Sequence, residues 1–340
     1  MIKKSLLEEG KTLIIAEVGS NHFGDIGLAK ESVAAAKEAG ADVVKFQLYR
    51  AEELVDDKMP VLKYITQTHD TQRERFKSLQ FDQKIFTELA DLAEAAGLHY
   101  LVTPFYPDAV EFLNPMVPAF KVASGDMTNK QLIDVCVATG KPVIVSTGLS
   151  SLGEVDWMVD QVPEEQLHIL HCVGVYPTPD DQVSLNTIPY LAKRYDQPIG
   201  YSDHGRGFTA PVAAVALGAH IIEKHFMADL SVPVADKDLS IGVADFKAMV
   251  SEIRRVEKMR GVEEKELQEG EGYFQSTLRR SIYAKRDIPA NTPIEKDWLI
   301  PLRPWSKEAV SPSDLDDLVG RKINTLVSAN TPILKSDLVP

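Results

Sequence analysis

The segments TLIIAEVG (residues 12–19) and LAKESVAAAKEAG (residues 28–40) set a pattern that much of the chain repeats. The first is a short run of apolar and β-branched residues, which is typical of a buried strand. The second carries apolar residues at helical spacing and ends in Gly40, a common helix terminator. The sequence therefore predicts a strand followed directly by a helix.

Further apolar runs of the same kind follow, and helical patterns lie between most of them. With 12–19 they make eight strand–helix units in about 250 residues, which matches an α/β fold of the (β/α)₈ TIM-barrel type. A doubly wound open sheet is the alternative, but neither a GxGxxG motif nor a phosphate-binding P-loop follows the first strand. The runs are DVVKFQL (42–48), HYLVTPF (99–105), AFKVASG (119–125), PVIVSTG (142–148), LHILHCV (167–173), PIGYSD (198–203) and HIIEKHF (220–226).

The composition changes after the last predicted barrel helix, so we expect more than one domain. Residues 1–262 form the barrel domain, 263–279 an acidic linker with glycines, and 280–340 a small β-rich domain with Pro and Asn turns. Within the barrel, the connections 49–80 and 226–242 are unusually long. Barrels build their active sites from the loops that follow strands, which makes both segments candidate site elements.

The overall charge limits the classes of partner. The 340 residues include 37 Lys and Arg against 50 Asp and Glu, a formal net charge of −13. This balance excludes nucleic acid, which needs a basic footprint. The net charge does not exclude an anionic substrate, because the charge around a local site can differ from the charge of the whole surface.

Two cysteines are too few for a disulfide framework, which favours a reducing, cytoplasmic compartment. The N-terminal residues lack the apolar stretch of a signal peptide, and no run approaches the ~18 apolar residues of a membrane span. We therefore expect no membrane partner.

Polar side chains occupy the carboxyl end of nearly every predicted strand, where barrels place catalytic groups. Lys45 and Lys121 lie inside apolar strands, where an ammonium group needs an anionic partner. In a structural interpretation, each lysine pairs with a core carboxylate such as Glu17 or Asp126. In a functional one, both lysines bind a phosphate and a carboxylate together with nearby hydroxyl groups. Those hydroxyls belong to Thr103, Ser124, Ser146 and Ser202.

His204 and His225 end two neighbouring predicted strands. Two imidazoles there could bind one divalent metal, although either could instead be a core histidine. No further Cys or His lies nearby in the sequence, so oxygen ligands would complete the shell, which favours Mn²⁺ or Mg²⁺ over structural Zn²⁺. Glu17, close to the barrel axis, could act as a general acid or base, or could pair with Lys45.

Taken in order, the strand-end motifs resemble those of the sialic acid synthase family, and the last 60 or so residues resemble its antifreeze-like SAF domain. The resemblance runs over essentially the whole chain. It implies a TIM barrel followed by a β-clip SAF domain, and an enzyme that condenses phosphoenolpyruvate with an N-acetylated sugar into a nonulosonic acid. The motifs are AEVGSNHFGD, VVKFQ, TPF, FKVASGD, VSTG, HCVGVYPTP, GYSDHG and EKHF.

The resemblance also implies a role for individual residues. His204 and His225 would hold Mn²⁺ or Mg²⁺, and Arg303 would enter the barrel of the partner subunit in a domain-swapped homodimer. Asp238 competes with Asp236 for one sugar contact. The implied catalytic residues are Glu17, Lys121, His204 and His225; those for phosphoenolpyruvate are Lys45, Thr103, Lys121, Ser124, Ser146 and Ser202; those for the acceptor sugar are Gln47, Asp126, Tyr176, Asp236 and Arg303.

Three departures from the family pattern leave the acceptor open. Gly174 stands where several members carry Asn or Ser, Asp126 stands where Glu is common, and 49–80 shows no clear counterpart of an asparagine that seats the acceptor. The candidates are N-acetylmannosamine, its 6-phosphate, and a 2,4-diacetamido precursor of legionaminic or pseudaminic acid.

Two other functions compete with a synthase. A Schiff-base pyruvate aldolase would use Lys121 or Lys45 as its nucleophile, but it leaves the two histidines and the hydroxyl groups without a role. A non-catalytic carbohydrate-binding protein would leave the polar strand ends unexplained.

Overall fold

The computed structural model describes residues 10–62, 65 and 69–339. Residues 1–9, on which the prediction of no signal peptide depends, lie outside this part, as do 63–64 and 66–68 of the long segment 49–80. Within the described residues, no helix is both long enough and apolar enough to span a bilayer.

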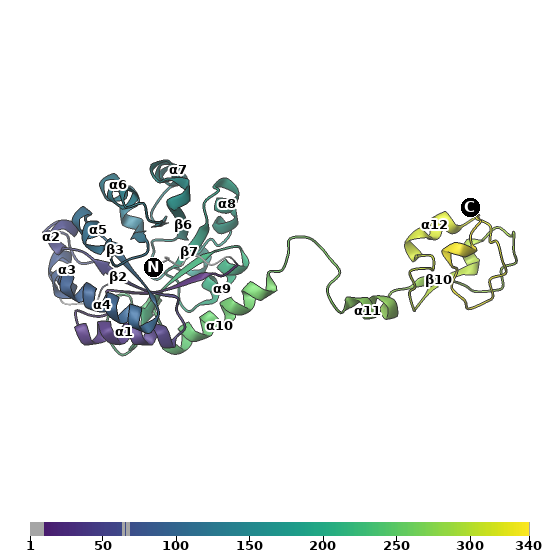
Figure 1. The fold of residues 1–340 in the computed structure, drawn as a ribbon, viewed down its shortest axis with the longest axis horizontal. Helices are drawn as coiled ribbons and strands as arrows, with labels where there is room; N and C mark the ends of the chain where they lie inside the picture. The colour runs from purple at the N-terminus through teal and green to yellow at the C-terminus, as the bar shows by residue number, and fades with distance from the viewer. Residues whose placement is uncertain (1–9, 63–64, 66–68, 340) are drawn as a thin grey trace. The chain divides into compact units, whose positions relative to one another are not determined.

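Eight parallel strands form a nearly closed barrel, which confirms the predicted TIM-barrel fold (Figure 1). Neighbouring strands pair in the order β3-β2-β1-β8-β7-β6-β5-β4, and β3 contacts β4 where the ring closes. The strands are β1 (Leu13–Gly19), β2 (Val43–Leu48), β3 (His99–Pro104), β4 (Phe120–Val122), β5 (Val143–Ser146), β6 (Leu167–Cys172), β7 (Ile199–Asp203) and β8 (Ile221–Met227).

Helices surround the strands and cover their outer faces (Figure 1). Asp25 caps the first of them by accepting a hydrogen bond from the Leu28 amide, 2.9 Å away. Gly97 ends another in a left-handed conformation, φ +69°, that a residue with a Cβ adopts at a cost. The surrounding helices are α1 (Ile26–Glu38), α4 (Gln83–Ala96), α5 (Pro107–Leu113), α6 (Lys130–Ala138), α7 (Leu152–Gln161), α8 (Thr187–Arg194), α9 (Thr209–Ala216) and α10 (Val243–Met259).

The barrel interior changes from apolar to charged along the strands. Because side chains alternate between the two faces of a strand, residues two apart point inward together. Ile15 pairs in register with Val43 in the apolar layer, and two residues later Glu17 pairs with Lys45 in the charged layer. The apolar layer is made of Leu13, Ile15, Val43, Leu101, Ala119, Ile144, Leu170 and Ile221.

The long connection 49–80, for which the sequence analysis predicted no secondary structure, contains two helices. Ala51–Leu54 forms α2 and Gln72–Leu79 forms α3. Thr71 and Glu74 make a capping box at the start of α3, in which each side chain accepts a hydrogen bond from the other residue's amide. In the other long connection, a 3₁₀ turn at Lys237–Leu239 precedes the short strand β9 (Ile241–Gly242), which pairs with β8.

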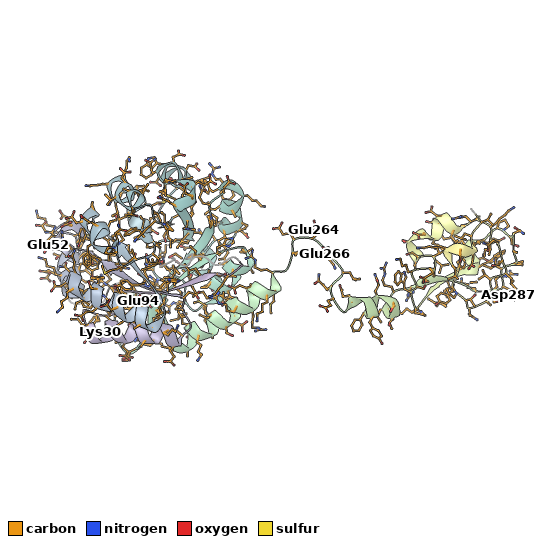
Figure 2. All side chains as sticks on the ribbon, viewed as in Figure 1. Lys30, Glu52, Glu94, Glu264, Glu266 and Asp287 are labelled. Carbon is orange, nitrogen blue, oxygen red and sulfur yellow. The ribbon has the colours of Figure 1, made fainter. Side chains whose placement is uncertain are left out.

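The chain divides into two compact units, Met1–Gly261 and Val262–Pro340. The second unit has its own apolar core, to which Ile282, Ile288 and Ile333 contribute. Its described elements include α11 (Glu271–Leu278), the antiparallel strands β10 (Ser281–Ala284) and β11 (Leu299–Leu302), and α12 (Leu315–Leu318). Residues 263–279, expected to be a linker, thus contain a helix. Figure 2 shows Glu264 and Glu266 projecting from the acidic stretch before it.

Candidate active site

A pocket of about 240 Å³ lies at the carboxyl ends of the barrel strands. It brings together most of the residues that the sequence singled out, from all eight strands or the turns directly after them. These are Glu17, Lys45, Gln47, Thr103, Lys121, Ser124, Ser146, Tyr176, Ser202, His204, His225 and Asp236.

Lys45 is buried in a shell of oxygen atoms. Its Nζ lies 2.7 Å from Glu17 Oε2 and 3.5 Å from Glu223 Oε2, and it donates a hydrogen bond to Thr103 Oγ1 at 3.1 Å. Burial alone would lower the pKa of Lys45, but the two carboxylates outweigh it and raise the pKa. Lys45 is therefore a fixed cation that pairs with Glu17 and also faces the pocket.

Lys121 has weaker anionic support than Lys45. Its Nζ donates to Ser146 Oγ at 2.6 Å and to the Val122 carbonyl at 3.0 Å, and lies 3.9 Å from Glu223 Oε1. Burial lowers the pKa of Lys121, and the attraction of Glu223 offsets this only in part. The carboxylate nearest to Lys121 among its described contacts is thus that of Glu223, and neither Glu17 nor Asp126, the two suggested examples, forms an ion pair with Lys121 among the residues that the structure describes.

Glu223 links the two lysines and was missed in the sequence. It also accepts a hydrogen bond from Ser202 Oγ at 3.2 Å. Burial would raise the pKa of Glu223, but Lys121 and Lys45 outweigh it and lower the pKa. The signal was present, because Glu223 lies two residues before His225 on β8 and so faces the same side. In the sequence, only the last residues of each predicted strand were considered, and Glu223 was therefore not included.

Glu17 lies in a setting that favours its protonated form. Burial raises its pKa, and the charge of Glu223 adds to that effect against the opposing effect of Lys45. Gln47 Nε2 donates to Glu17 Oε1 at 2.6 Å. A Cβ at Gly19 would lie 2.9 Å from that same oxygen, so a larger residue there would displace the carboxyl group. Two neighbouring carboxyl groups with opposite pKa shifts are typical of an acid–base site.

His204 and His225 lie side by side, with ring centroids 5.5 Å apart. His204 Nδ1 lies 2.8 Å from the Val173 carbonyl oxygen and 3.6 Å from Cys172 Sγ, and against the effect of burial these two contacts raise the pKa of His204 to about 9. A metal bound at Nε2 would therefore displace a proton from this ring. His225 Nδ1 is buried, has no hydrogen-bond partner in the part of the chain that the structure describes, and lies 3.9 Å from Asp236 Oδ2. Burial lowers the pKa of His225 well below its ordinary value, which keeps the ring neutral as a metal ligand requires.

These two imidazoles fit a shared divalent cation whose remaining ligands are oxygen atoms. Over the described parts of the chain, no three His, Cys, Asp or Glu residues form a complete metal-binding group. The missing ligands would therefore be water or substrate oxygen, as in a catalytic site with open positions.

Comparison with known sequences places the chain in a family. The sequence profile described as the NeuB family matches residues 32–265, more than half of the chain, and that of the SAF domain matches residues 279–339. The chain belongs to the NeuB family. The predicted resemblance to sialic acid synthases and the predicted SAF domain are confirmed.

Several relatives of this NeuB-family chain are named as enzymes, and the match to them covers nearly the whole length of both chains. The N,N'-diacetyllegionaminic acid synthase of Legionella pneumophila is 37% identical over 94% of this chain and 93% of its own length. The N-acetylneuraminate-9-phosphate synthase of Homo sapiens is 33% identical over 95% of this chain and 91% of its own. A solved N-acetylneuraminic acid synthetase of Leptospira borgpetersenii superposes with a TM-score of 0.71 at 31% identity, covering 78% of this chain and 90% of that one. This chain is therefore an enzyme of the same family, and a purely carbohydrate-binding role is excluded.

Asp126 and Asp238 are not among the described residues that line this pocket of the NeuB-family chain, and Arg303 belongs to the other compact unit. Asp126 is in the 3₁₀ turn Ser124–Asp126, where it accepts a hydrogen bond from Asn129 Nδ2 at 3.2 Å, and it is not among the lining residues. Asp238 is exposed and forms an ion pair with Arg206 at 2.8 Å, whereas Asp236 lines the pocket. Arg303 belongs to the second unit, where its Nε donates to the Leu278 carbonyl oxygen, so its role across a dimer stays a prediction.

The departure at Gly174 has a steric explanation. A Cβ added there would lie 2.4 Å from Leu149 Cδ2. Leu149 lines the pocket and has a positive φ of 65°. In this NeuB-family chain, a residue larger than glycine at position 174 would therefore clash with the leucine side chain.

A buried ion pair lies directly behind the two histidines and was also missed. Lys224 Nζ lies 2.6 Å from Asp203 Oδ2 and donates to the Gly205 carbonyl oxygen at 2.5 Å. Asp203 Oδ1 accepts from Tyr201 OH and from the Gly205 amide. These contacts fix the turn that carries His204 to the strand that carries His225. The signal was the pair of charged residues, in YSDHG and EKHF, each next to a histidine.

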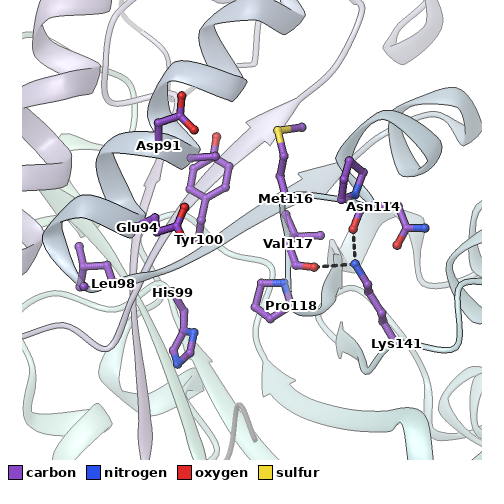
Figure 3. Close-up of a pocket in the computed structure, with 13 residues that line it drawn as sticks. Asp91, Glu94, Leu98, His99, Tyr100, Asn114, Met116, Val117, Pro118 and Lys141 are labelled. Carbon is purple, nitrogen blue, oxygen red and sulfur yellow. Dashed lines mark hydrogen bonds between the residues drawn. The ribbon is translucent and has the colours of Figure 1, made fainter. Parts of the chain in front are cut away.

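A larger cavity, of about 770 Å³, lies elsewhere on the barrel, between α4, the start of β3 and the turn before β4 (Figure 3). Lys141 Nζ closes one side by donating to the carbonyl oxygens of Asn114 and Val117. None of the described residues that line it is a predicted site residue. Cavity size alone would therefore have pointed away from the charged centre of the barrel.

Proposed function

We propose that this enzyme is a nonulosonic acid synthase. It would condense phosphoenolpyruvate with the open-chain aldehyde of an N-acetylated sugar and release phosphate by C–O cleavage, in a reaction dependent on a divalent metal. The observation that supports this most is the buried pair Lys45 and Lys121, which faces the same pocket as His204 and His225. Cations next to a candidate metal site suit a reaction between an anionic enol phosphate and a carbonyl compound.

The lysines and hydroxyls would hold phosphoenolpyruvate. Lys45 and Lys121 are charge-assisted donors for its phosphate and carboxylate. Hydroxyl groups from four different strand ends surround them and fix the orientation of the enol phosphate, which makes the bond-forming step effectively unimolecular. The hydroxyls are those of Thr103, Ser124, Ser146 and Ser202.

His204 and His225 would hold Mn²⁺ or Mg²⁺, whose chemical contribution is Lewis-acid polarisation of the acceptor's carbonyl oxygen. The Val173 carbonyl orients the ring of His204, and Tyr176 stacks on that ring with centroids 4.2 Å apart. Gln47, Tyr176 and Asp236 would face the acceptor from the pocket wall. Arg303 of a partner subunit would complete the site in a domain-swapped homodimer. Asp126 follows two lining residues, Ser124 and Gly125, and its contact with the sugar stays a prediction.

Glu17 would handle the proton of the reaction. The C3 carbon of phosphoenolpyruvate adds to the aldehyde carbon, water adds at C2, and the tetrahedral intermediate expels phosphate. Burial raises the pKa of Glu17, which favours this residue as the group that exchanges a proton with that water or with the new hydroxyl. Gln47 holds the carboxyl group in place for this transfer.

One observation favours a second candidate, a Schiff-base pyruvate aldolase. Burial lowers the pKa of Lys121, and a neutral amine is the nucleophile that forms an imine. Incubation with pyruvate and borohydride would trap a covalent adduct on Lys121, and the activity would survive a chelator.

The experiment that tests the proposed function is a phosphate-release assay. The full-length enzyme is incubated with Mn²⁺, phosphoenolpyruvate and, one at a time, N-acetylmannosamine, its 6-phosphate and a 2,4-diacetamido sugar. We expect phosphate and a nine-carbon keto acid only when both substrates are present. Activity on pyruvate in chelator, together with a borohydride adduct, would instead establish the aldolase.

A further inference from the structure

Strands β7 and β8 are joined by a buried ion pair on the face that points away from the active-site pocket. Asp203 of β7 and Lys224 of β8 are in register between the two strands. Their neighbours Ser202, Glu223 and His225 line the pocket, and side chains alternate between the two faces of a strand. The ion pair therefore lies behind the pocket wall and can act on the site only through the residues beside it.

Lys224 connects β8 to the turn that follows β7. Its Nζ lies 2.6 Å from Asp203 Oδ2 and donates a hydrogen bond to the Gly205 carbonyl oxygen at 2.5 Å. The side chains of Lys224 and Asp203 are 0% and 1% exposed. His204 stands between Asp203 and Gly205 in the turn, and His225 directly follows Lys224 in the chain. One ammonium group thus links the main chain beside both candidate metal ligands.

Asp203 holds the same turn through its second oxygen. Its Oδ1 accepts a hydrogen bond from Tyr201 OH at 2.7 Å and from the Gly205 amide at 3.0 Å. The carbonyl oxygen of His204 accepts a further hydrogen bond, from the Thr178 amide at 2.9 Å. The main chain of His204 is therefore held at the residue itself and on both sides of it.

A buried ion pair is a weak source of stability. Removing two charges from water costs about as much as their attraction returns, so a well-packed neutral replacement is often neutral or stabilising. Groups that support metal ligands from behind have a clearer effect, because their loss typically weakens metal binding by about 10- to 100-fold. The place of Lys224 and Asp203, next to both histidines, favours the second role.

We propose that Lys224 and Asp203 are positioning residues, which hold His204 and His225 at the separation that lets the two rings share one divalent cation. Their contribution is to metal affinity and not to net stability. This inference rests on the proposed function, in which the two histidines bind Mn²⁺ or Mg²⁺. The ring centroids lie 5.5 Å apart, and without the ammonium group the turn that carries His204 loses its link to β8.

The test separates the charge balance of the pair from the link that it makes. In Lys224→Met, the Asp203 carboxylate stays buried without its cation. In the double variant Lys224→Met with Asp203→Asn, no charge is left unpaired, and the asparagine Oδ1 can still accept from Tyr201 and from the Gly205 amide. Both variants lose the link from β8 to the Gly205 carbonyl.

Lys141→Met serves as the matched control. Lys141 also donates to two main-chain carbonyl oxygens of the barrel, those of Asn114 and Val117, but it lines the larger cavity and not the active-site pocket. Two properties of each full-length protein are measured. The dissociation constant for Mn²⁺ comes from the electron paramagnetic resonance signal of the free ion, and Tm is measured in chelator, so that bound metal does not add to stability.

We expect Lys224→Met to lower Tm by at least about 5 °C, because it leaves a buried carboxylate unpaired. The double variant should return to within about 3 °C of the wild type. Both should nevertheless bind Mn²⁺ at least about tenfold more weakly than the wild type. Lys141→Met should bind Mn²⁺ as the wild type does, whatever its Tm.

A double variant that binds Mn²⁺ as tightly as the wild type would overturn the positioning role and leave the metal site intact. Equal weakening in Lys141→Met, or a double variant as unstable as Lys224→Met, would overturn it as well, since the effect would then be one on the fold. A wild type that binds no Mn²⁺ would refute the metal site and the positioning role together. If no acceptor releases phosphate but the pattern of Mn²⁺ affinities holds, the positioning role stands while the proposed reaction does not.

Discussion

The ammonium group of Lys45 lies 2.7 Å from Glu17 Oε2, and both side chains are almost fully buried at the centre of the barrel. The pair needs its own compensation, because removing one partner of a buried ion pair leaves the other without charge balance. Glu223, 3.5 Å from Lys45, shares the lysine and faces Lys121 on its other side. In the proposed function, phosphoenolpyruvate binding and fold stability both depend on Lys45, Lys121, Glu17 and Glu223, and a double variant can separate the two effects.

Replacing Lys45 by Met should destabilise the fold by about 3–5 kcal/mol and abolish phosphoenolpyruvate binding, because two buried carboxylates lose a cation. The double variant Lys45→Met with Glu17→Gln should recover part of that stability and none of the binding. Denaturant unfolding and calorimetric titration with phosphoenolpyruvate measure the two effects. Equal loss of stability in the single and double variants would contradict the charge-balance explanation.

Replacing His204 or His225 by Ala should remove metal-dependent activity while leaving the fold intact, since the rings sit at the carboxyl ends of strands and not in the apolar layer. Mn²⁺ binding, followed by the electron paramagnetic resonance signal of the free ion, should weaken by at least about tenfold in each variant. Circular dichroism checks the fold. Undiminished Mn²⁺ binding in the double variant would show that the metal lies elsewhere.

His22 should make stability depend on pH. Burial lowers its pKa from 6.5 to about 4, and its ring stacks on Phe81 at 4.2 Å. The unfolded chain takes up a proton below pH 6.5 and the folded one does not, so the stability is full above pH 6.5 and decreases as the pH falls toward 4. One pKa unit corresponds to about 1.4 kcal/mol, so the loss attributable to His22 is about 3 kcal/mol.

The variant His22→Gln lacks the titrating ring and serves as the comparison for this prediction. The free energy of unfolding of both proteins is measured with urea between pH 7 and pH 4. As the pH falls, the wild type should lose about 3 kcal/mol more of this free energy than the variant does. A difference that is constant with pH would mean that His22 does not titrate differently in the two states.

Mixed dimers test the proposed contribution of Arg303 across the subunit interface. Arg303→Ala and His204→Ala should each be inactive. When both are co-expressed and the mixed dimer is purified through two tags, one barrel combines an intact His204 with Arg303 from the other chain. Such dimers should show about half of the wild-type activity per dimer. Inactive mixed dimers would indicate that each barrel uses an arginine of its own chain or none.

The sequence predicted the barrel well because its signal is periodic. The expected run 42–48 became β2 at Val43–Leu48, and 167–173 became β6 at Leu167–Cys172. The strand-end residues could then be placed in one pocket, because the closure of a parallel barrel brings strand ends together whatever their separation in the chain. Glu223 was missed because only the last inward-facing residue of the predicted strand, His225, was considered, and Glu223 lies two residues before it.

The connecting segments were less predictable than the strands. Helix α3 reads QRERFKSL, in which only Phe76 and Leu79 are apolar, so the usual apolar stripe is absent. The T-x-x-E capping box at Thr71 was the available signal. The choice between Asp236 and Asp238 had no periodic signal at all and depended on the turn geometry, in which Asp238 pairs with Arg206.

The most direct measurement of the central claim uses phosphoenolpyruvate labelled with ¹⁸O in the bridging oxygen. The enzyme is supplied with Mn²⁺ and the acceptor that releases most phosphate, and the products are analysed by mass spectrometry. A synthase that adds water at C2 and breaks the C–O bond should place the label in the released phosphate, with an unlabelled nine-carbon keto acid. Label retained in the keto acid, with unlabelled phosphate, would contradict the proposed reaction.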